Sequence, residues 1–435
     1  MKVYKKTMCM ILTVVLMAFA PLTGCTEKTE EAPTEITLMH GWGGTFKNHK
    51  IMQEIYDGFS KENPDIVLKC ISYSDSSIAV EKANDMLAVG KGPDILSTNG
   101  LSYYVRNAVK CDRLLDLMPF IEADQSLKKQ IHPAVFETWE TSGGKLYTIP
   151  DALEVAGFWY NEAYLKEAGI ADKEGNMCLA SSWEEFKDIT EQLQKWIDSS
   201  GQELSVFAMD NAQMAELLFL ARLAGENENG IRAAENPYIK IREETLTSAI
   251  KDLDFVMQHS RVVDNIENAR QDFIDGKSII YFNGVWESEL LMDSSCQKDF
   301  RYSNYPAPGG KSLAYVSPSS GYVVTKQRDK KKEEACVRFL KYMLSEEVQT
   351  KIAVETGQAP SNPDIDMEKV IQEYPLLGNA VNTAYQAEIQ IKTMDSVWPG
   401  YKVDIVHKYL DTKFWNTDGI SEILRSLNGN QGEMP

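Results

Sequence analysis

Strand and helix patterns alternate after the N-terminal segment, and this alternation limits the fold more than any other feature. Short apolar runs at 36–40, 66–71 and 94–97 have the length and the bounding turn residues of buried strands. Between them, residues 51–59 and 78–87 carry apolar side chains at helical spacing. A β-α-β-α-β order predicts a parallel sheet with right-handed crossovers and helices on both faces.

A second α/β block begins near residue 146. Ser182 and Glu185 form a capping-box pattern that opens a helix, and Gly357 is expected to cap another helix. The Lys330–Lys332 run is expected to be a solvated turn. Further strand patterns occur at 155–160, 278–282 and 322–325. The whole order predicts an α/β protein with two lobes.

Composition excludes several classes of protein. The 435 residues are 43% hydrophobic and 25% charged, which is typical of a globular chain and not of a disordered or multi-span membrane protein. The net charge of −19 repels phosphate, so we expect no nucleic-acid partner. Seven scattered cysteines do not indicate a disulfide scaffold.

Residues 1–24 have the pattern of an export signal. Three lysines precede an apolar run at 8–20 that is too short to span a bilayer. The sequence Leu-Thr-Gly-Cys at 22–25 resembles the lipobox of bacterial lipoproteins, in which the cysteine is acylated and becomes the new N-terminus. A plain secretory signal with a chance cysteine is the alternative. We predict a signal peptide at 1–24, lipid attachment at Cys25 and a flexible tether at 25–34.

Motifs that carry catalysis or metal binding are absent or incomplete. The five histidines include no closely spaced pair of metal ligands, and no Gly-x-Ser-x-Gly elbow occurs. Gly276-Lys277-Ser278 resembles the end of a phosphate-binding loop, but the first glycine of that loop is missing. Nothing selects a carboxylate pair for glycoside hydrolysis. We expect no enzyme activity, no metal and no other cofactor.

Nine short segments follow one another in a familiar order: Phe59–Asp65, Gly90–Asp94, Gly144–Pro150, Trp159–Asn161, Lys166–Gly169, Trp183–Phe186, Phe282–Trp286, Tyr305–Gly310 and Ser320–Val324. Together they resemble family 1 extracellular solute-binding proteins, the carbohydrate receptors of the maltose-binding-protein type. The resemblance extends from Ile36 to about Trp415. It departs at Met39-His40, and no Asp or Lys pair follows Trp42, which leaves the solute open.

The resemblance implies a two-lobed fold. Two mixed sheets are flanked by helices, the chain crosses a hinge three times, and the solute is held between the lobes. The crossings are expected near 151–155, 320–323 and 358–362. The lobes are then an N-terminal one of 35–151 plus 323–358 and a C-terminal one of 152–322 plus 359–435.

A sugar presents C–H faces flanked by hydroxyls, so its site needs aromatic platforms together with polar donors and acceptors. Trp42, Trp286 and Trp398 stand beside chain breaks and are predicted platforms, with core or hinge packing as the alternative. The other predicted ligand contacts are at strand ends and crossings: Gly43, Gly44, Thr45, Ser97, Asn99, Asp151, Glu154 and Tyr322. Turn formation, capping or hinge bracing is the alternative for these residues.

These observations predict a lipid-anchored receptor on the outer face of the bacterial cell membrane. It is expected to act as a monomer, to close on a sugar or oligosaccharide, and to deliver it to the permease subunits of an ABC importer. Two alternatives stay open: the same fold with a polyamine or other cation as solute, and an extracytoplasmic glycoside hydrolase. Acidic residues clustered in the cleft would favour a cation.

Overall fold

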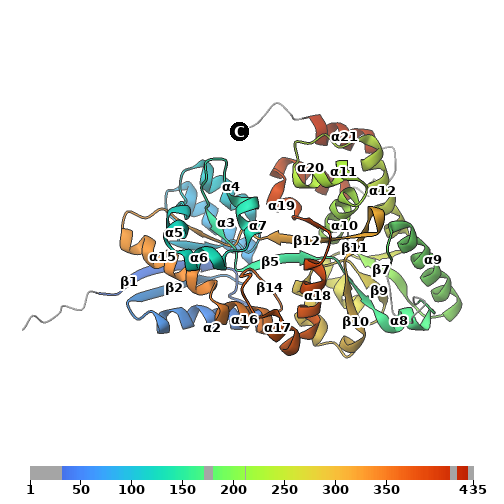
Figure 1. Cartoon of the computed structure of the whole chain (residues 1–435), viewed down its shortest axis with the longest axis horizontal. Helices are drawn as coiled ribbons and strands as arrows, with labels where there is room; N and C mark the ends of the chain where they lie inside the picture. Colours follow the sequence, from blue (N-terminus) through green and yellow to red (C-terminus); the bar gives the residue numbers. More distant parts are fainter. Residues whose placement is uncertain (1–31, 171–179, 211, 412–418, 430–435) are drawn as a thin grey trace, which may run out of the picture. The chain divides into compact units, whose positions relative to one another are not determined.

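A computed structural model describes residues 32–170, 180–210, 212–411 and 419–429 (Figure 1). The predicted signal peptide, the predicted lipidation site Cys25 and nearly all of the predicted tether lie outside the described residues. Thr34, the last residue of that tether, already belongs to the first strand. From Thr34 onward the chain forms a single unit, which is the subject of the rest of this description.

The strands are β1 (Thr34–His40), β2 (Ile66–Ser72), β3 (Ile95–Ser97), β4 (Thr148–Ile149), β5 (Ala152–Ala156), β6 (Phe158–Asn161), β7 (Ser205–Met209), β8 (Ser260–Val262), β9 (Ser278–Tyr281), β10 (Phe300–Ser303), β11 (Tyr305–Ala307), β12 (Lys311–Pro318), β13 (Tyr322–Val324), β14 (Ala359–Pro360) and β15 (Ile389–Ile391).

The helices of the first half are α2 (Lys47–Glu62), α3 (Ser76–Ala88), α4 (Ser102–Lys110), α5 (Met118–Ala123), α6 (Gln125–Gln130), α7 (Pro133–Trp139), α8 (Glu162–Glu167), α9 (Trp183–Ser200) and α10 (Gln213–Ala224). Those of the second half are α11 (Glu228–Glu235), α12 (Glu243–Gln258), α13 (Ile266–Ile274), the 3-10 turn η1 (Val285–Glu287), α14 (Ser288–Met292), the turns η2 (Gln297–Asp299) and η3 (Pro308–Gly310), α15 (Lys330–Met343), α16 (Glu346–Thr356), α17 (Met367–Glu373), α18 (Pro375–Tyr385), α19 (Met394–Val397), α20 (Gly400–Asp411) and α21 (Ile420–Gly429). Within the described chain, no helix combines the length and apolar composition that crossing a bilayer requires.

The strands form three mixed or antiparallel sheets. One has the order β2-β1-β3-β13-β4, in which β1 is parallel to β2 and β3 while β13 is antiparallel to β3 and β4. Another has the order β10-β6-β9-β7-β8, and the third runs β11-β12-β5-β14 with β15 beside β12. The α/β class is confirmed. The sequence predicts two sheets, and the third arises because β5, β12 and β14, near the predicted crossings, pair with one another.

Local patterns explain most of the first sheet. The predicted order of β1, α2, β2, α3 and β3 is confirmed, and α2 turns Met52, Ile55, Tyr56 and Phe59 inward at helical spacing. The predicted strand at 155–160 is wrong as one element. It divides at Gly157 into β5 and β6, which belong to different sheets. A side chain at Gly157 would lie 2.4 Å from the carbonyl oxygen of Ser303, so only glycine fits there.

Asp94, the last residue of the Gly90–Asp94 motif, joins three elements. Its carboxylate accepts hydrogen bonds from the backbone N–H of Thr37, at 2.8 Å, and from the Thr37 hydroxyl, at 3.0 Å. Lys332 in the first turn of α15 reaches the same carboxylate at 3.1 Å. The expectation that Lys330–Lys332 forms a solvated turn is therefore wrong, because these residues begin a helix and one of them is paired.

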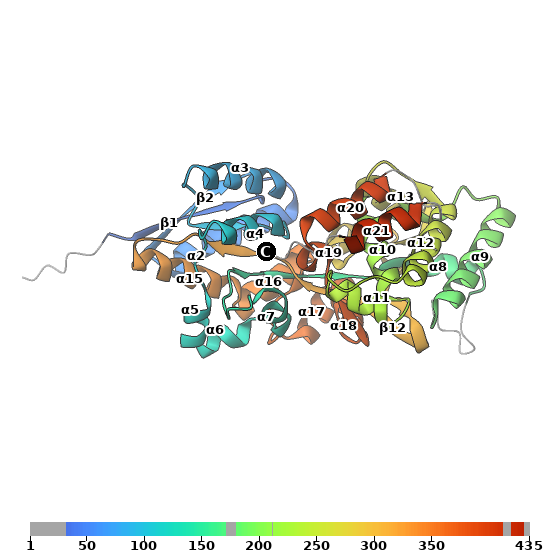
Figure 2. The same ribbon diagram turned by 90° about the horizontal axis from the view of Figure 1, so that it is seen from above.

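Buried apolar side chains gather in separate cores. What we call the first core draws on residues 36–149 and 322–352, on both faces of the β1 sheet. The second core draws on residues 153–316 and 353–427. Figures 1 and 2 show the resulting interleaving, since α15 and α16 (orange) lie with the blue and teal elements of the first core.

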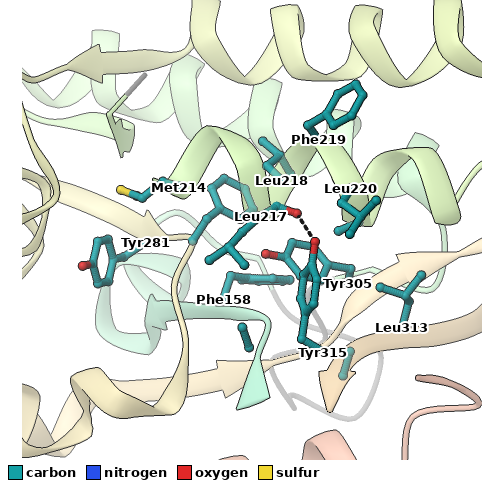
Figure 3. Close-up of a cluster of buried hydrophobic side chains, with 14 of the residues drawn as sticks. Phe158, Met214, Leu217, Leu218, Phe219, Leu220, Tyr281, Tyr305, Leu313 and Tyr315 are labelled. Carbon is teal, nitrogen blue, oxygen red and sulfur yellow. Dashed lines mark hydrogen bonds between the residues drawn. The ribbon is translucent and has the colours of Figure 1, made fainter. Parts of the chain in front are cut away.

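Helix α10 occupies the middle of the second core. Ten of its residues are buried, and all of these except Arg222 are apolar, so the helix is enclosed rather than amphipathic. Phe158, Tyr281 and Tyr305 surround it together with Tyr315, whose hydroxyl donates to the Leu217 carbonyl at 2.6 Å (Figure 3). This bond satisfies a phenol that would otherwise be unpaired in an apolar interior.

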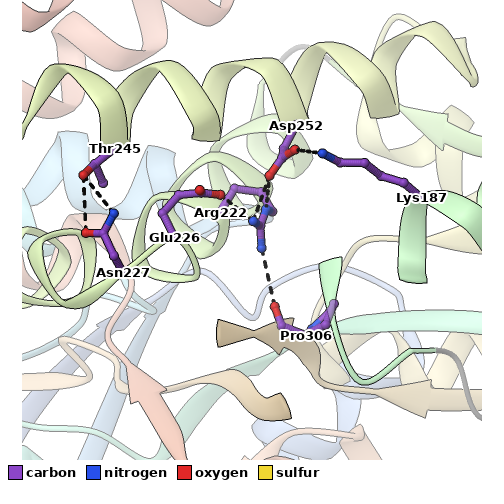
Figure 4. Close-up of polar contacts among 7 residues, drawn as sticks. All are labelled: Lys187, Arg222, Glu226, Asn227, Thr245, Asp252 and Pro306. Atoms are coloured by element: carbon purple, nitrogen blue, oxygen red, sulfur yellow. Dashed lines mark hydrogen bonds and ion pairs between the residues drawn. The ribbon is translucent and has the colours of Figure 1, made fainter. Parts of the chain in front are cut away.

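A buried arginine ties α10 to its neighbours. Arg222 is 2% exposed and donates from Nε, at 3.0 Å, and from Nη2, at 2.8 Å, to one oxygen of Asp252 (Figure 4). Nη2 also reaches Glu226 at 2.5 Å, and Lys187 binds the second Asp252 oxygen at 2.6 Å. The guanidinium lies 3.9 Å from the ring centre of Trp183. Helices α9, α10 and α12 are thus joined by one charged network.

Arg222→Ala is expected to lower the free energy of unfolding by about 3 kcal/mol, because the buried carboxylates of Asp252 and Glu226 lose their main cation. Urea denaturation followed by circular dichroism measures the change. Arg232→Ala, at an exposed position in α11, is the matched control and is expected to change stability by less than about 0.5 kcal/mol. Equal stability of the two variants would contradict the structural role of the network.

Candidate functional site

The loops after the first strands meet at one edge of their sheet, as expected for parallel strands. A side chain at Gly41, after β1, would lie 2.4 Å from atoms of Ser76, at the start of α3. Asn99, after β3, donates from Nδ2 to the Ser76 hydroxyl at 3.1 Å. Asn99 has φ of +44°, a left-handed conformation that asparagine tolerates better than most residues. The predicted residues Trp42 and Asn99 thus lie in loops that meet at Ser76.

Trp42 is 7% exposed and largely enclosed by its own loop. Its ring stands edge-on to His49 with 5.3 Å between ring centres, and its carbonyl accepts from Gln53 Nε2 at 2.6 Å. Its indole N–H is buried with no hydrogen-bond partner among the described residues. Burial lowers the pKa of the nearby His40 to about 4, and His49 adds a smaller effect.

The glycine turn uses its own N–H groups. The backbone N–H of Gly43 donates to the Tyr73 carbonyl at 2.7 Å, and that of Gly44 donates to His49 Nδ1 at 2.9 Å. In this conformation neither N–H group is free to donate to a solute, because both are already paired. Thr45 is exposed at the end of the turn.

Three of the predicted polar contacts are enclosed instead. Ser97, Asp151 and Tyr322 are all buried, and the Tyr322 hydroxyl lies 2.9 Å from the Tyr56 hydroxyl. Burial raises the pKa of Asp151, and a hydrogen bond with Tyr322 opposes that rise. In this conformation all three groups are enclosed by the protein, and their contact with a solute stays a prediction.

Glu154 on β5 lies beside the loop after β3. Its Oε1 atom is 2.7 Å from the position that a side chain at Gly100 would take, so Gly100 leaves room for the carboxylate. Its Oε2 atom accepts from the Thr393 hydroxyl at 2.9 Å. Burial raises the pKa of Glu154 to about 7; the Thr393 hydrogen bond opposes this rise, and the negative charges of Asp395 and Glu216 add to it.

Asp395 and Glu216 extend this acidic cluster. Burial also raises the pKa of Asp395, Glu216 adds to the rise, and His407 and Arg106 oppose it. His407 on α20 forms an ion pair with Glu216 on α10, and the hydrogen bond between them raises the pKa of His407. The pairing with Glu216 therefore favours the protonated form of His407.

A cavity of about 430 Å³ opens at the Glu216–His407 pair. Its walls come from the start of α10 and the end of α20: Ala212, Gln213, Glu216, His407, Lys408 and Asp411. The lining includes an amide, two carboxylates, an imidazole and an ammonium beside a larger apolar surface.

Helix α4 of the first core touches this region directly. The Ser102 hydroxyl donates to the carbonyl oxygen of Asp395 at 2.7 Å, and Arg106 Nη2 donates to the same oxygen. Figure 2 shows α4 and α19 side by side. The polar cluster is therefore built by both cores, with α4 from the first core and β5, α10, α19 and α20 from the second.

The remaining predicted platforms differ from each other. Trp286 in η1 is partly exposed and packs at the border of the second core. Gly284 makes room for it, because a side chain there would lie 2.1 Å from the indole. Trp398 is 1% exposed, and its indole N–H donates to the Ala234 carbonyl at 3.2 Å. Trp398 therefore shows no open face to a solute in this conformation, whereas Trp286 keeps one side at the surface.

Sequence reasoning missed Ser102, Arg106, Glu216, Thr393 and His407. None stands in a recognisable motif, and the Glu154–Thr393 pair alone spans 239 positions. His407 is exposed on α20, and its pairing with Glu216 shows that it lies at the cluster. In the described part of the chain, no three His, Cys, Asp or Glu side chains are arranged to hold a metal ion.

Comparison with known families and structures agrees with this architecture. Residues 54–379 match the family model described as bacterial extracellular solute-binding protein. A comparison with curated proteins finds no match.

Solved structures share the fold at low sequence identity. A Streptococcus pneumoniae solute-binding protein in complex with the blood group A-trisaccharide is 22% identical, with a TM-score of 0.73 over 91% of this chain and 98% of that one. A chitin oligosaccharide binding protein is 19% identical, with a TM-score of 0.73 over 92% and 100%. The RafE protein of Streptococcus pneumoniae in complex with raffinose is 17% identical, with a TM-score of 0.65 over 91% and 98%.

Glu154→Gln tests the electrostatics of the cluster. Because the pKa of Glu154 is raised from 4.5 to about 7, the unfolded chain loses this proton first as the pH rises, and stability falls between those two values. The amide keeps the Thr393 hydrogen bond and carries no charge. The quantity of interest is the free energy of unfolding of the variant minus that of wild type. We expect this difference to be about 2 kcal/mol more positive at roughly pH 8 than at roughly pH 4.

Urea unfolding at both pH values measures this difference. Glu140→Gln, at an exposed position after α7, serves as the control and is expected to show no such dependence. A Glu154→Gln effect that is the same at both pH values would show that the carboxyl is not held in an unfavourable environment.

Proposed function

Because the chain belongs to the family of bacterial extracellular solute-binding proteins, we propose that it captures a sugar or oligosaccharide at the polar cluster around Glu154 and presents it to the permease subunits of an ABC importer. The family and the structural neighbours are binding proteins rather than enzymes. The observation that carries the proposal is the meeting of polar groups from both cores near Glu154, beside a partly exposed indole.

The indole in question is that of Trp286. Its turn lies against β5, since Ala156 pairs with Gly284, and Glu154 is two residues before Ala156 on the same strand. A sugar ring that stacks on Trp286 places its hydroxyls toward Glu154, whose carboxyl both donates and accepts when partly protonated. Asn99 and Thr45 supply further polar groups from the first core. Trp42 contributes its unpaired N–H if the turn opens.

Capture works by closure of the two lobes around the solute. We assign 35–151 plus 323–358 to the N-terminal lobe and 152–322 plus 359–435 to the C-terminal lobe, with crossings at the residues given above. A solute that bridges both lobes stabilises their closed arrangement, and the permease reads that arrangement. The receptor acts as a monomer and requires no cofactor.

The family is extracellular, so the chain functions outside the cytoplasm. Anchoring through acyl chains on Cys25, after removal of residues 1–24, is part of the proposal. A single acyl chain binds a membrane weakly, so stable attachment requires more than one chain.

A solute with a positive charge is the second candidate. The carboxylates of Glu154, Asp395 and Glu216 favour it, because a bound cation would relieve their mutual repulsion. Arg106 already places a positive charge beside Asp395, which favours the neutral sugar. Removing the carboxylate of Glu154 abolishes binding of a cation, whereas removing the Trp286 ring abolishes stacking of a sugar.

A panel of oligosaccharides tests the main proposal. Calorimetry is expected to find one that binds wild type, and small-angle scattering is expected to show compaction on binding. Trp286→Ala is expected to weaken binding by about tenfold or more, since it removes the stacking platform. Trp196→Ala, a partly buried tryptophan on α9, is the control and is expected to leave affinity unchanged. Absence of binding and compaction across the panel would overturn the proposal.

Expression in a bacterium with labelled palmitate tests the anchor. Wild-type protein is expected to carry label and to sediment with membranes, and Cys25→Ala is expected to lose both properties. Cys111→Ala removes an exposed cysteine in the first core and is expected to behave as wild type. Unlabelled wild-type protein in the soluble extracellular fraction would favour a plain secretory signal.

A further inference from the structure

One pair of hydrogen bonds joins the two cores through residues that are not among the predicted solute contacts. Both bonds end on the backbone oxygen of Asp395 in α19, and both donors come from α4: the Ser102 hydroxyl at 2.7 Å, and Arg106 Nη2. Ser102 is the first residue of α4 and Arg106 lies one helical turn later, so the two donors share one face of the helix.

The surroundings make this contact costly to break. Ser102 is buried and Arg106 is partly buried, and burial lowers the pKa of Arg106 while the Asp395 carboxylate opposes that change. A separated Arg106 regains water, but the Asp395 carbonyl and the Ser102 hydroxyl must each find new partners.

The position of the contact links it to the site. Helix α4 directly follows the β3 loop that carries Asn99, and Asp395 is two residues after Thr393, which binds Glu154. The contact therefore connects the wall of the site that α4 forms with the wall that α19 forms. It forms only when the β3 end of the first core and the α19 segment of the second core approach each other.

We infer that Ser102 and Arg106 form a latch with the Asp395 carbonyl that holds the two cores in the solute-bound arrangement. Arg106 is then a positioning residue: it strengthens solute binding by stabilising closure, and it does not touch the solute. This inference rests on the proposed function, since closure matters only if a solute is captured between the cores.

Arg106→Ala and Ser102→Ala are the test variants, and Arg106→Lys keeps the charge and one donor. With the saccharide found in the panel, Arg106→Ala is expected to raise Kd by about tenfold, which corresponds to about 1.4 kcal/mol. Ser102→Ala is expected to raise it less, and Arg106→Lys is expected to restore part of the affinity. Arg338→Ala is the control, because Arg338 pairs with Asp65 at the exposed surface of the N-terminal lobe and not across the two cores. It is expected to bind as wild type.

Small-angle scattering without saccharide provides the second measurement. Arg106→Ala is expected to give a larger radius of gyration than wild type, with circular dichroism unchanged. Wild type that binds no saccharide would refute the proposed function, and the scattering comparison would still test the latch. Unchanged or tighter binding by Arg106→Ala, or unchanged scattering, would overturn the latch. Should Arg106→Ala fail to fold, Ser102→Ala carries the same two measurements.

Discussion

The antiparallel pairing of β5 with β12 is the interaction on which the site depends. In its register Glu154 is opposite Ser317, and the Ser317 hydroxyl lies 3.1 Å from that of Thr393. Thr393 in turn donates to Glu154. A shift of one residue would turn Glu154 to the other face of the sheet and break this chain of contacts. Backbone pairing between segments about 160 positions apart thus sets the place of one carboxyl group.

Local sequence patterns predict the secondary structure well, and the motif-based family resemblance is confirmed. Short apolar runs and their spacing predict strands and helices such as β1 and α2. Tertiary contacts do not override these local preferences. The site is harder to predict because its groups are paired across the fold. Trp398 precedes Pro399-Gly400, as a tryptophan in a loop would, yet a carbonyl of α11 accepts a hydrogen bond from its indole N–H. The N–H groups of Gly43 and Gly44 are likewise used by neighbours that no pattern identifies.

The carboxyl groups of the site have a property that suits hydroxyl ligands. With a pKa of about 7, Glu154 is close to half protonated in neutral solution and offers both a donor and an acceptor. A fully ionised carboxylate could only accept hydrogen bonds. In the proposed sugar site, the burial that raises the pKa of Glu154 would therefore let this carboxyl both donate hydrogen bonds to solute hydroxyls and accept them.

The late position of β13 in the chain affects how the protein is made. This strand is inserted between β3 and β4, about 170 to 220 positions after them, so the first sheet has a gap until residues 322–324 are available. Until then β3 presents an unpaired edge lined by apolar side chains, which is prone to aggregate. The first sheet therefore cannot be completed until about three quarters of the chain has been synthesised.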